Sequence, residues 1–179
     1  MVYVMLADGF EEIEALAVVD ILRRGNVKVK TVSVYEQDKV TGAHGIEVVP
    51  DITFSRVKKD AEIIVLPGGI PGTPNLQAHS ALAELLCDEH AKGTYIAAIC
   101  AAPMILGEMD FLNGKTATCY PSFEKHLKGA VCSTDKVCID GNIITSRGAG
   151  TAHDFAFVLL SLLKGKDKSD EIRGAMLYD

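Results

Sequence analysis

Three short apolar runs, each closed by a sharp turn, constrain the fold of this chain more than any other feature. They lie at Val2–Leu6, Glu62–Leu66 and Thr94–Ile99, and each has the length and composition of a strand buried in a parallel sheet. Helical patterns follow all three runs, so strands and helices alternate along the chain. Such alternation predicts the α/β class and a doubly wound, mostly parallel sheet. Because we find no internal repeat, low-complexity tract or linker, we expect residues 1–179 to form one domain.

The remaining segments are predicted from their periodicity and their turn residues. A small hairpin that strays from the main sheet is expected within Gln37–Val49, and the polar stretch Asp51–Asp60 is expected to be a connector with at most one helical turn. The other predicted elements are strands at Val27–Val34, Lys115–Tyr120 and Ala130–Cys132, a short helical turn at Phe123–Leu127, a hairpin formed by Val137–Ile139 and Ile143–Ser146, and helices at Ser80–Lys92, Thr151–Leu163 and Ser169–Met176.

The helix predicted for residues 11–24 carries apolar side chains on two faces. Acidic residues in its first turn and arginines in its last turn suit the helix dipole, and Gly25 ends it. A helix that is apolar all round is buried on both sides, so one face can contact its own sheet and the other a second subunit. We therefore expect a homodimer through helix 11–24. The two faces consist of Ala15, Val18, Val19 and Leu22, and of Ile13, Leu16, Ala17 and Ile21.

Composition excludes several classes of function. The net charge is −6 and no run of Lys or Arg exceeds two residues, which argues against a nucleic-acid partner. No apolar run reaches the roughly 18 residues of a membrane span, and the chain opens on an apolar strand without a basic leader, so we expect no membrane partner and no signal peptide. The five cysteines are odd in number and form no C-x-x-C pair, which indicates reduced thiols in the cytoplasm and neither a disulfide scaffold nor a zinc site.

A single cysteine, Cys100, directly follows the run Thr94–Ile99. Two alanines and Pro103 come next, and a proline at that distance suits the first turn of a helix. The thiol is therefore predicted at a strand-to-helix corner, where the free N–H groups and the positive end of a helix favour the thiolate and lower its pKa. The same corner carries the nucleophile of many hydrolases. A buried structural cysteine at the end of a core strand is the other interpretation, and this stretch alone favours neither.

Acidic and glycine residues elsewhere offer partners for that thiol. Glu14 lies in the first turn of a helix with apolar flanks, where a carboxyl with a raised pKa can donate a hydrogen bond to a thiolate. The residues alone fit better with a helix-dipole acid like its neighbours. Gly68 and Gly69 follow a buried strand, so their N–H groups can point at a substrate oxygen, and the Ala101 N–H can supply another donor. An ordinary turn is the alternative for the glycine pair.

The carboxyl ends of parallel strands meet at one edge of a sheet, where such folds bind ligands. We expect the segments that follow these ends to meet there, namely Ala7–Phe10, Pro67–Gly72, Cys100 and Tyr120. None of the five histidines lies next to Cys100, and no cluster of His, Asp and Glu shows metal-ligand spacing, so we predict no metal site. The glycine pattern also lacks the nucleotide-binding motifs, and no cofactor is expected.

Five motifs, in this order along the chain, resemble those of the ThiJ/PfpI superfamily, in the branch that contains the parkinsonism-associated protein and its bacterial relatives. The resemblance covers essentially the whole chain, and five ordered motifs make it specific. The motifs are Asp8–Ala15, Val19–Gly25, Val65–Gly69, Ile96–Pro103 and Thr145–Thr151.

The resemblance implies a flavodoxin-like fold of the class I glutamine-amidotransferase type, a three-layer α/β/α sandwich that is usually a homodimer built on the first helix. It also implies that Cys100 is the nucleophile and that Glu14 is the carboxyl in contact with the thiol. Where some relatives have a histidine before a proline, this chain has Tyr120. Where some have an arginine near the hairpin that reaches the partner's site, the nearest residue here is His44, and Arg24 is the other candidate for such a contribution.

The resemblance implies two classes of activity. One is cofactor-free conversion of glyoxals to hydroxy acids, with removal of aldehyde adducts, so that the partner is a small aldehyde such as methylglyoxal or a glycated protein. There Cys100 adds to the aldehyde and Glu14 moves a proton. The other is a non-catalytic stress sensor or chaperone that works through oxidation of Cys100. Peptidases of the superfamily carry a histidine directly after the cysteine, where this chain has Ala101, and the superfamily's older association with thiamine synthesis has no support in these residues. The residues expected to bind the substrate or its oxyanion are Gly68, Gly69, Ala101 and Tyr120.

Overall fold

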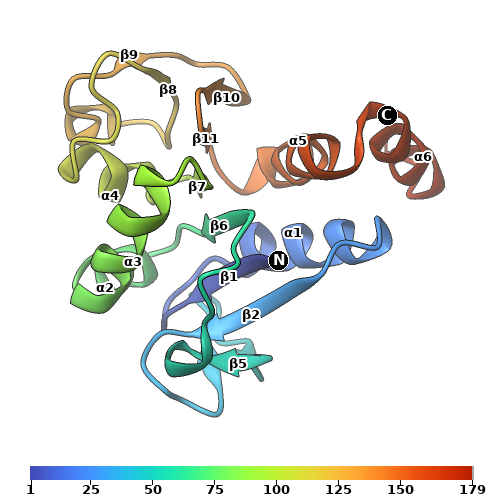
Figure 1. Ribbon diagram of the computed structural model, residues 1–179, viewed down its shortest axis with the longest axis horizontal. Coiled ribbons are helices and arrows are strands. Elements are labelled where there is room, and N and C mark those ends of the chain that lie inside the picture. The colour runs from blue at the N-terminus through green and yellow to red at the C-terminus, as the bar shows by residue number, and fades with distance from the viewer. Residues whose placement is uncertain (179) are drawn as a thin grey trace.

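A computed structural model describes residues 1–178 of the chain (Figure 1). Seven strands form one sheet in the order β10-β11-β7-β6-β1-β2-β5, and every neighbouring pair is parallel except β10 and β11. The predicted doubly wound, mostly parallel sheet is confirmed. Its strands are β1 (Val2–Leu6), β2 (Val29–Ser33), β5 (Ile52–Thr53), β6 (Ile63–Leu66), β7 (Tyr95–Ile99), β10 (Val137–Asp140) and β11 (Ile143–Ser146).

Helices cover both faces of this sheet, which gives the predicted three layers (Figure 1). The helices are α1 (Glu12–Arg24), α2 (Gly72–Gln77), α3 (Ser80–Ala91), α4 (Pro103–Glu108), α5 (Ala152–Lys164) and α6 (Lys166–Ala175). Alternate side chains of a strand point to opposite faces of its sheet. Val4 of β1 accordingly belongs to the apolar core shared with α1, α5 and α6, whereas Met5 belongs to the core shared with α2, α3 and α4.

Two small strand pairs stand apart from the main sheet. The predicted hairpin is formed by β3 (Val40–Thr41) and β4 (Glu47–Val48), which are antiparallel. The candidate strands of the later region form a parallel pair, β8 (Thr116–Ala117) with β9 (Val131–Cys132). Within residues 1–178, the structure contains no helix with the length and apolar character needed to cross a bilayer.

The structure adds two elements that sequence periodicity does not predict. β5 lies inside the segment expected to be a polar connector and pairs with β2, and the 3₁₀ turn Phe54–Arg56 follows it. α2 follows the loop after β6. A strand of two residues is too short to show a period, and a helix of six residues that contains glycine and proline shows no amphipathic stripe.

The helix predicted to be apolar on two faces has one face in the core of its own chain. Val18 and Val19 of α1 pack there as expected, and so does Ile21, which the sequence assigns to the opposite face. Ile21 is buried because α1 contacts α5 as well as the sheet. Ile13 is 52% exposed. A second subunit that covers Ile13 stays a prediction.

Candidate active site

The corner after β7 holds Cys100 in a rare backbone conformation. Its φ is +65°, in the left-handed region that non-glycine residues seldom adopt. Two hydrogen bonds fix the corner, because the Cys100 N–H donates to the Ser146 carbonyl at 3.0 Å and the Cys100 carbonyl accepts from the Tyr120 N–H at 2.8 Å. α4 begins three residues later, with Pro103 in its first turn. The predicted strand–cysteine–helix corner is confirmed, and strain of this kind gathers at functional sites.

The side chain of Glu14 is fully buried beside the Cys100 thiol. One carboxylate oxygen, Oε2, accepts a hydrogen bond of 2.8 Å from the N–H of Gly68. The other oxygen, Oε1, is buried and has no hydrogen-bond partner among the described residues, and the Cys100 thiol lies close enough to the carboxyl to lower its pKa. The helix-dipole interpretation of Glu14 is therefore wrong, because a surface acid of that kind keeps its carboxylate in water, whereas this carboxyl has 0% exposure.

Burial raises the pKa of Glu14 to about 7, although the Gly68 N–H and the thiol both pull the pKa down. Burial also raises the pKa of the Cys100 thiol, to about 12, and the charge of an ionised Glu14 raises it further, against the N–H groups of Ala101 and Gly69 that lower it. The expectation that a helix start alone gives Cys100 a low pKa is thus wrong. At pH between these two values the Glu14–Cys100 pair holds one proton and one negative charge. The thiolate forms when the thiol proton passes to Glu14.

The two glycines after β6 have different roles. The N–H of Gly68 serves Glu14 and is not free for a substrate oxygen, which corrects the expectation for that residue. Gly69, with φ of +97°, and Ala101 instead direct their N–H groups at the Cys100 sulfur. A Cβ at Gly68 would lie 2.6 Å from the Cys100 Cβ and 2.7 Å from Glu14 Oε2. Only glycine permits this close approach.

The ring of Tyr120 lies close to Gly148, which also borders the Cys100 sulfur. A Cβ placed on Gly148 would be 3.3 Å from Tyr120 Cδ2 and 3.9 Å from the Cys100 sulfur, so ring, thiol and glycine backbone border the same space. The ring is half exposed. A pocket of about 310 Å³ opens beside it. Its lining consists of Tyr120, Pro121, Arg147, Gly148, Ala149, Gly150 and Thr151.

His44 and Arg24 do not reach the thiol of their own chain. His44 lies in the β3–β4 turn, and both its backbone N–H and its ring Nδ1 are 2.8 Å from the carboxylate of Glu12. Arg24 pairs with Asp20 at the far end of α1, roughly 15 Å along the helix from Glu14. A contribution of either residue to a partner subunit stays a prediction.

The same turn brings together a group that the sequence does not reveal. Glu11, Glu12 and His44 each offer one possible metal-ligand atom, and these atoms lie within 4.8 Å of one another. The chain separation of 32 residues between Glu12 and His44 hides the group from any motif search. Hydrogen bonds from His44 lower the pKa of Glu12 despite its burial, and Glu12 in turn raises the pKa of His44. An ion pair accounts for this arrangement.

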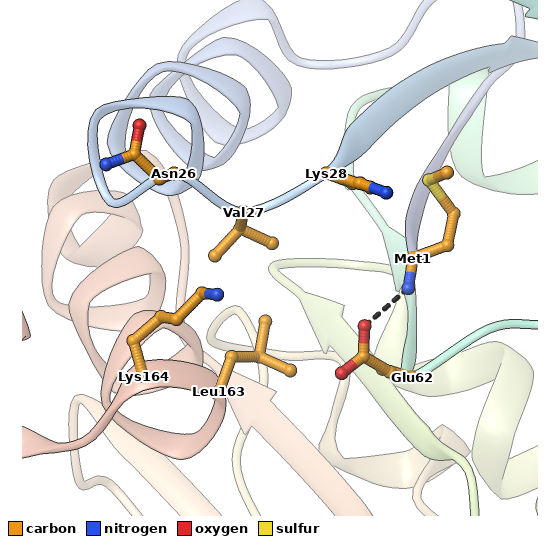
Figure 2. A pocket seen from close by; sticks show the side chains of 7 residues that line it. All are labelled: Met1, Asn26, Val27, Lys28, Glu62, Leu163 and Lys164. Atoms are coloured by element: carbon orange, nitrogen blue, oxygen red, sulfur yellow. Dashed lines mark hydrogen bonds and ion pairs between the residues drawn. The ribbon is translucent and has the colours of Figure 1, made fainter.

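A second cavity lies at the opposite edge of the sheet, where β1, β2 and β6 begin (Figure 2). Its volume is about 170 Å³. Figure 2 shows the amino group of Met1 paired with Glu62 on one wall, and Lys164 and Leu163 of the last turn of α5 on another. Parallel sheets bind ligands beyond the carboxyl ends of their strands, so this cavity is separate from the site at Cys100.

Comparisons with known proteins identify the family of the chain. The family model described as DJ-1/PfpI family matches residues 1–162. The chain belongs to this family. An Arabidopsis thaliana relative, Protein DJ-1 homolog A, is 40% identical over 98% of the chain, which spans 46% of that protein's length. A Caenorhabditis elegans relative, glutathione-independent glyoxalase DJR-1.2, is 34% identical over 90% of this chain and 87% of its own.

Solved structures of the family confirm the flavodoxin-like fold. A crystal structure of a DJ-1 superfamily protein from Salmonella typhimurium superposes with a TM-score of 0.95 at 34% identity, and covers 99% of this chain and 98% of the other. DJ-1/PfpI membership is what the five sequence motifs predict. The motifs contain the Cys100 corner, Glu14, the glycine pair after β6, the last part of α1 and the segment that joins β11 to α5.

Proposed function

We propose that this protein is a cysteine-dependent enzyme that converts 2-oxoaldehydes such as methylglyoxal to 2-hydroxy acids, or removes their adducts from proteins. The observation that carries the proposal is the fully buried carboxyl of Glu14 beside the Cys100 thiol. Such a pair supplies a nucleophile and a general base in contact with each other. The name of the Caenorhabditis elegans relative as a glutathione-independent glyoxalase supports the same reaction class.

The first step is addition to the aldehyde. The thiol proton passes to Glu14, the Cys100 sulfur bonds to the aldehyde carbon, and the carbonyl oxygen becomes an oxyanion that takes this proton from Glu14, which leaves Glu14 a carboxylate again. The N–H groups of Gly69 and Ala101 already point at the sulfur, so they lie next to the bond that forms and can hold that oxyanion. The product of this step is a hemithioacetal on Cys100.

The second step moves one proton between the two carbons. Glu14 removes the proton from the former aldehyde carbon and delivers it to the neighbouring ketone carbon, while the proton of the hemithioacetal hydroxyl passes to the ketone oxygen, which gives a thioester of the hydroxy acid. Water then cleaves the thioester and restores the thiol. The aldehyde carbon is oxidised and the ketone carbon is reduced within one molecule, so the overall reaction consumes only water.

A stress sensor is the second candidate, and the surroundings of the sulfur favour it as well. Peroxide would oxidise the Cys100 thiolate to a sulfenate and then a sulfinate. The N–H groups of Gly69 and Ala101 and a protonated Glu14 would each donate a hydrogen bond to the added oxygens. Both candidates need the same thiol, so the reaction with methylglyoxal separates them.

The test is to incubate the purified protein with methylglyoxal and to measure lactate. We expect lactate from the unchanged protein and none from Cys100→Ser. Cys87→Ser is the matched control, because Cys87 is an exposed thiol on α3, away from the site. If Cys100 is free and reacts with an alkylating reagent but the protein forms no lactate, the enzymatic proposal is rejected and the stress sensor is the candidate that stands.

A further inference from the structure

The pocket beside Tyr120 is larger than a three-carbon aldehyde requires. Its volume of about 310 Å³ falls in the range of pockets that hold whole small-molecule ligands. The pocket lies next to the thiol, because Gly148, which lines it, has no side chain and a Cβ placed there would be 3.9 Å from the Cys100 sulfur. The lining is mostly backbone and carbon, and it contains one charged side chain, Arg147.

Arg147 has hydrogen-bond donors to spare. Its Nη1 donates to the Thr134 carbonyl at 3.0 Å, and within residues 1–178 the guanidinium makes no other side-chain hydrogen bond and no ion pair. A guanidinium carries five N–H donors, so most of them stay available to a ligand. The hydrogen bond to Thr134 restrains the side chain of Arg147, a residue that lines the pocket.

The start of the helical stretch before α5 lies in the same wall. Residues 149–151 form a 3₁₀ turn that leads directly into α5, and all three line the pocket. The N–H groups of Ala149 and Gly150 have no backbone acceptor among the described residues. Free N–H groups favour an anion, as does the guanidinium.

We propose that this pocket binds the tail of the substrate and that Arg147 selects tails that end in a carboxylate. The substrate class is then a small 2-oxoaldehyde with an acidic group a few carbons from the reacting aldehyde. This inference rests on the proposed function, since it takes Cys100 as the reacting atom. Arg147 acts as a specificity residue, and the chemical steps stay with Cys100 and Glu14.

The test measures how fast Cys100 is alkylated by two matched reagents, 5-bromo-4-oxopentanoate and its methyl ester. In each case the thiolate displaces bromide, so that a carbon–sulfur bond forms and the carbon–bromine bond breaks. The reagents differ only in the charge at the far end. Relative to the ratio for free cysteine, we expect the acid to label Cys100 about tenfold faster than the ester, the usual size of a charge-assisted hydrogen bond that is partly exposed.

Substitutions assign that preference to Arg147. Arg147→Gln should bring the acid-to-ester ratio to the value for free cysteine, and Arg147→Lys should keep part of it because the charge remains. Lys164→Gln removes one positive charge at the opposite edge of the sheet and should keep the full ratio. A thermal melt checks that each variant is folded.

Two results would overturn the inference. The first is an acid-to-ester labelling ratio in the unchanged protein that equals the ratio for free cysteine, a result that does not depend on any variant. The second is a folded Arg147→Gln variant that still labels about tenfold faster with the acid than with the ester. Alkylation does not depend on turnover. Lactate formation from methylglyoxal without any acid preference would therefore refute the acidic-tail inference alone, and acid preference without lactate would refute the proposed function alone.

Discussion

Replacing Glu14 with glutamine should stabilise the protein at alkaline pH while it removes turnover. Burial raises the pKa of Glu14 from 4.5 to about 7. A difference of about 2.5 pH units corresponds to about 3 kcal/mol at 1.36 kcal/mol per unit. Because the pKa is higher in the folded state, folding favours the protonated acid. The contribution of protonated Glu14 to the free energy of unfolding is fully present below pH 4.5 and is lost as the pH rises through 7. The glutamine side chain of the variant has no charge to acquire, so the variant escapes this penalty.

The assay is urea unfolding of both proteins at pH 5 and pH 8. We expect Glu14→Gln to exceed the unchanged protein by up to about 3 kcal/mol in free energy of unfolding at pH 8, and by much less at pH 5. Lactate formation from methylglyoxal should fall by roughly 10²–10⁴-fold in the same variant, the usual contribution of a general base. Cys100 should stay open to alkylation, since the amide can still donate a hydrogen bond to the sulfur.

The control is Glu84→Gln, which removes an exposed carboxylate of α3 and should change stability by less than about 0.5 kcal/mol at either pH. A Glu14→Gln variant that is less stable than the unchanged protein at pH 8 would refute the argument, because Glu14 would then have to be a stabilising charge. A stability difference equal at pH 5 and pH 8 would refute the raised pKa.

Three further outcomes follow from the same geometry. The kcat/KM for methylglyoxal should rise with pH through a single step near 7, as Glu14 ionises and can accept the thiol proton, and a profile without that step would exclude Glu14 as the base. Tyr120→Phe should lower kcat by no more than about tenfold, about 1.4 kcal/mol for one lost hydrogen bond, and a loss as large as that of Glu14→Gln would make Tyr120 catalytic. Ile13→Asp should convert the expected dimer to a monomer in light scattering without unfolding it, because Ile13 is exposed within its own chain, and an unchanged protein that is already monomeric at micromolar concentration would contradict the dimer.

Sequence patterns predict well the strands that position this site. β1, β6 and β7 are apolar runs with turns at their ends, and their order along the chain fixes which edge of the sheet carries Cys100. Sequence patterns miss elements that are very short and contacts between residues that are far apart in the sequence. β5 has two residues, and the contact of His44 with Glu12 joins segments 32 residues apart. Arg147 lies inside a motif of the sequence, yet no local pattern shows that it shares a pocket with Tyr120.

The pKa values of Glu14 and Cys100 cannot be predicted from the sequence for a different reason. A helix start suggests a thiolate, but Cys100 is three residues ahead of a helix of only six residues, and burial outweighs the dipole at that distance. Whether Glu14 faces water or the thiol depends on how α1 sits against the loop after β6, which is a matter of packing between elements.

The backbone at Gly68 moderates the effect that burial has on the pKa of the proposed catalytic base. Burial alone would drive the pKa of Glu14 higher and leave it a permanent acid, whereas the Gly68 N–H favours the carboxylate and brings the pKa back to about 7. A group with that pKa can both accept and release a proton near neutral pH, which is what a step that moves a proton between two carbons requires. The N–H can reach Glu14 only because position 68 has no side chain, since a Cβ there would stand 2.7 Å from Oε2. A glycine in the loop after β6 thus tunes an acid on α1 for a thiol at the end of β7.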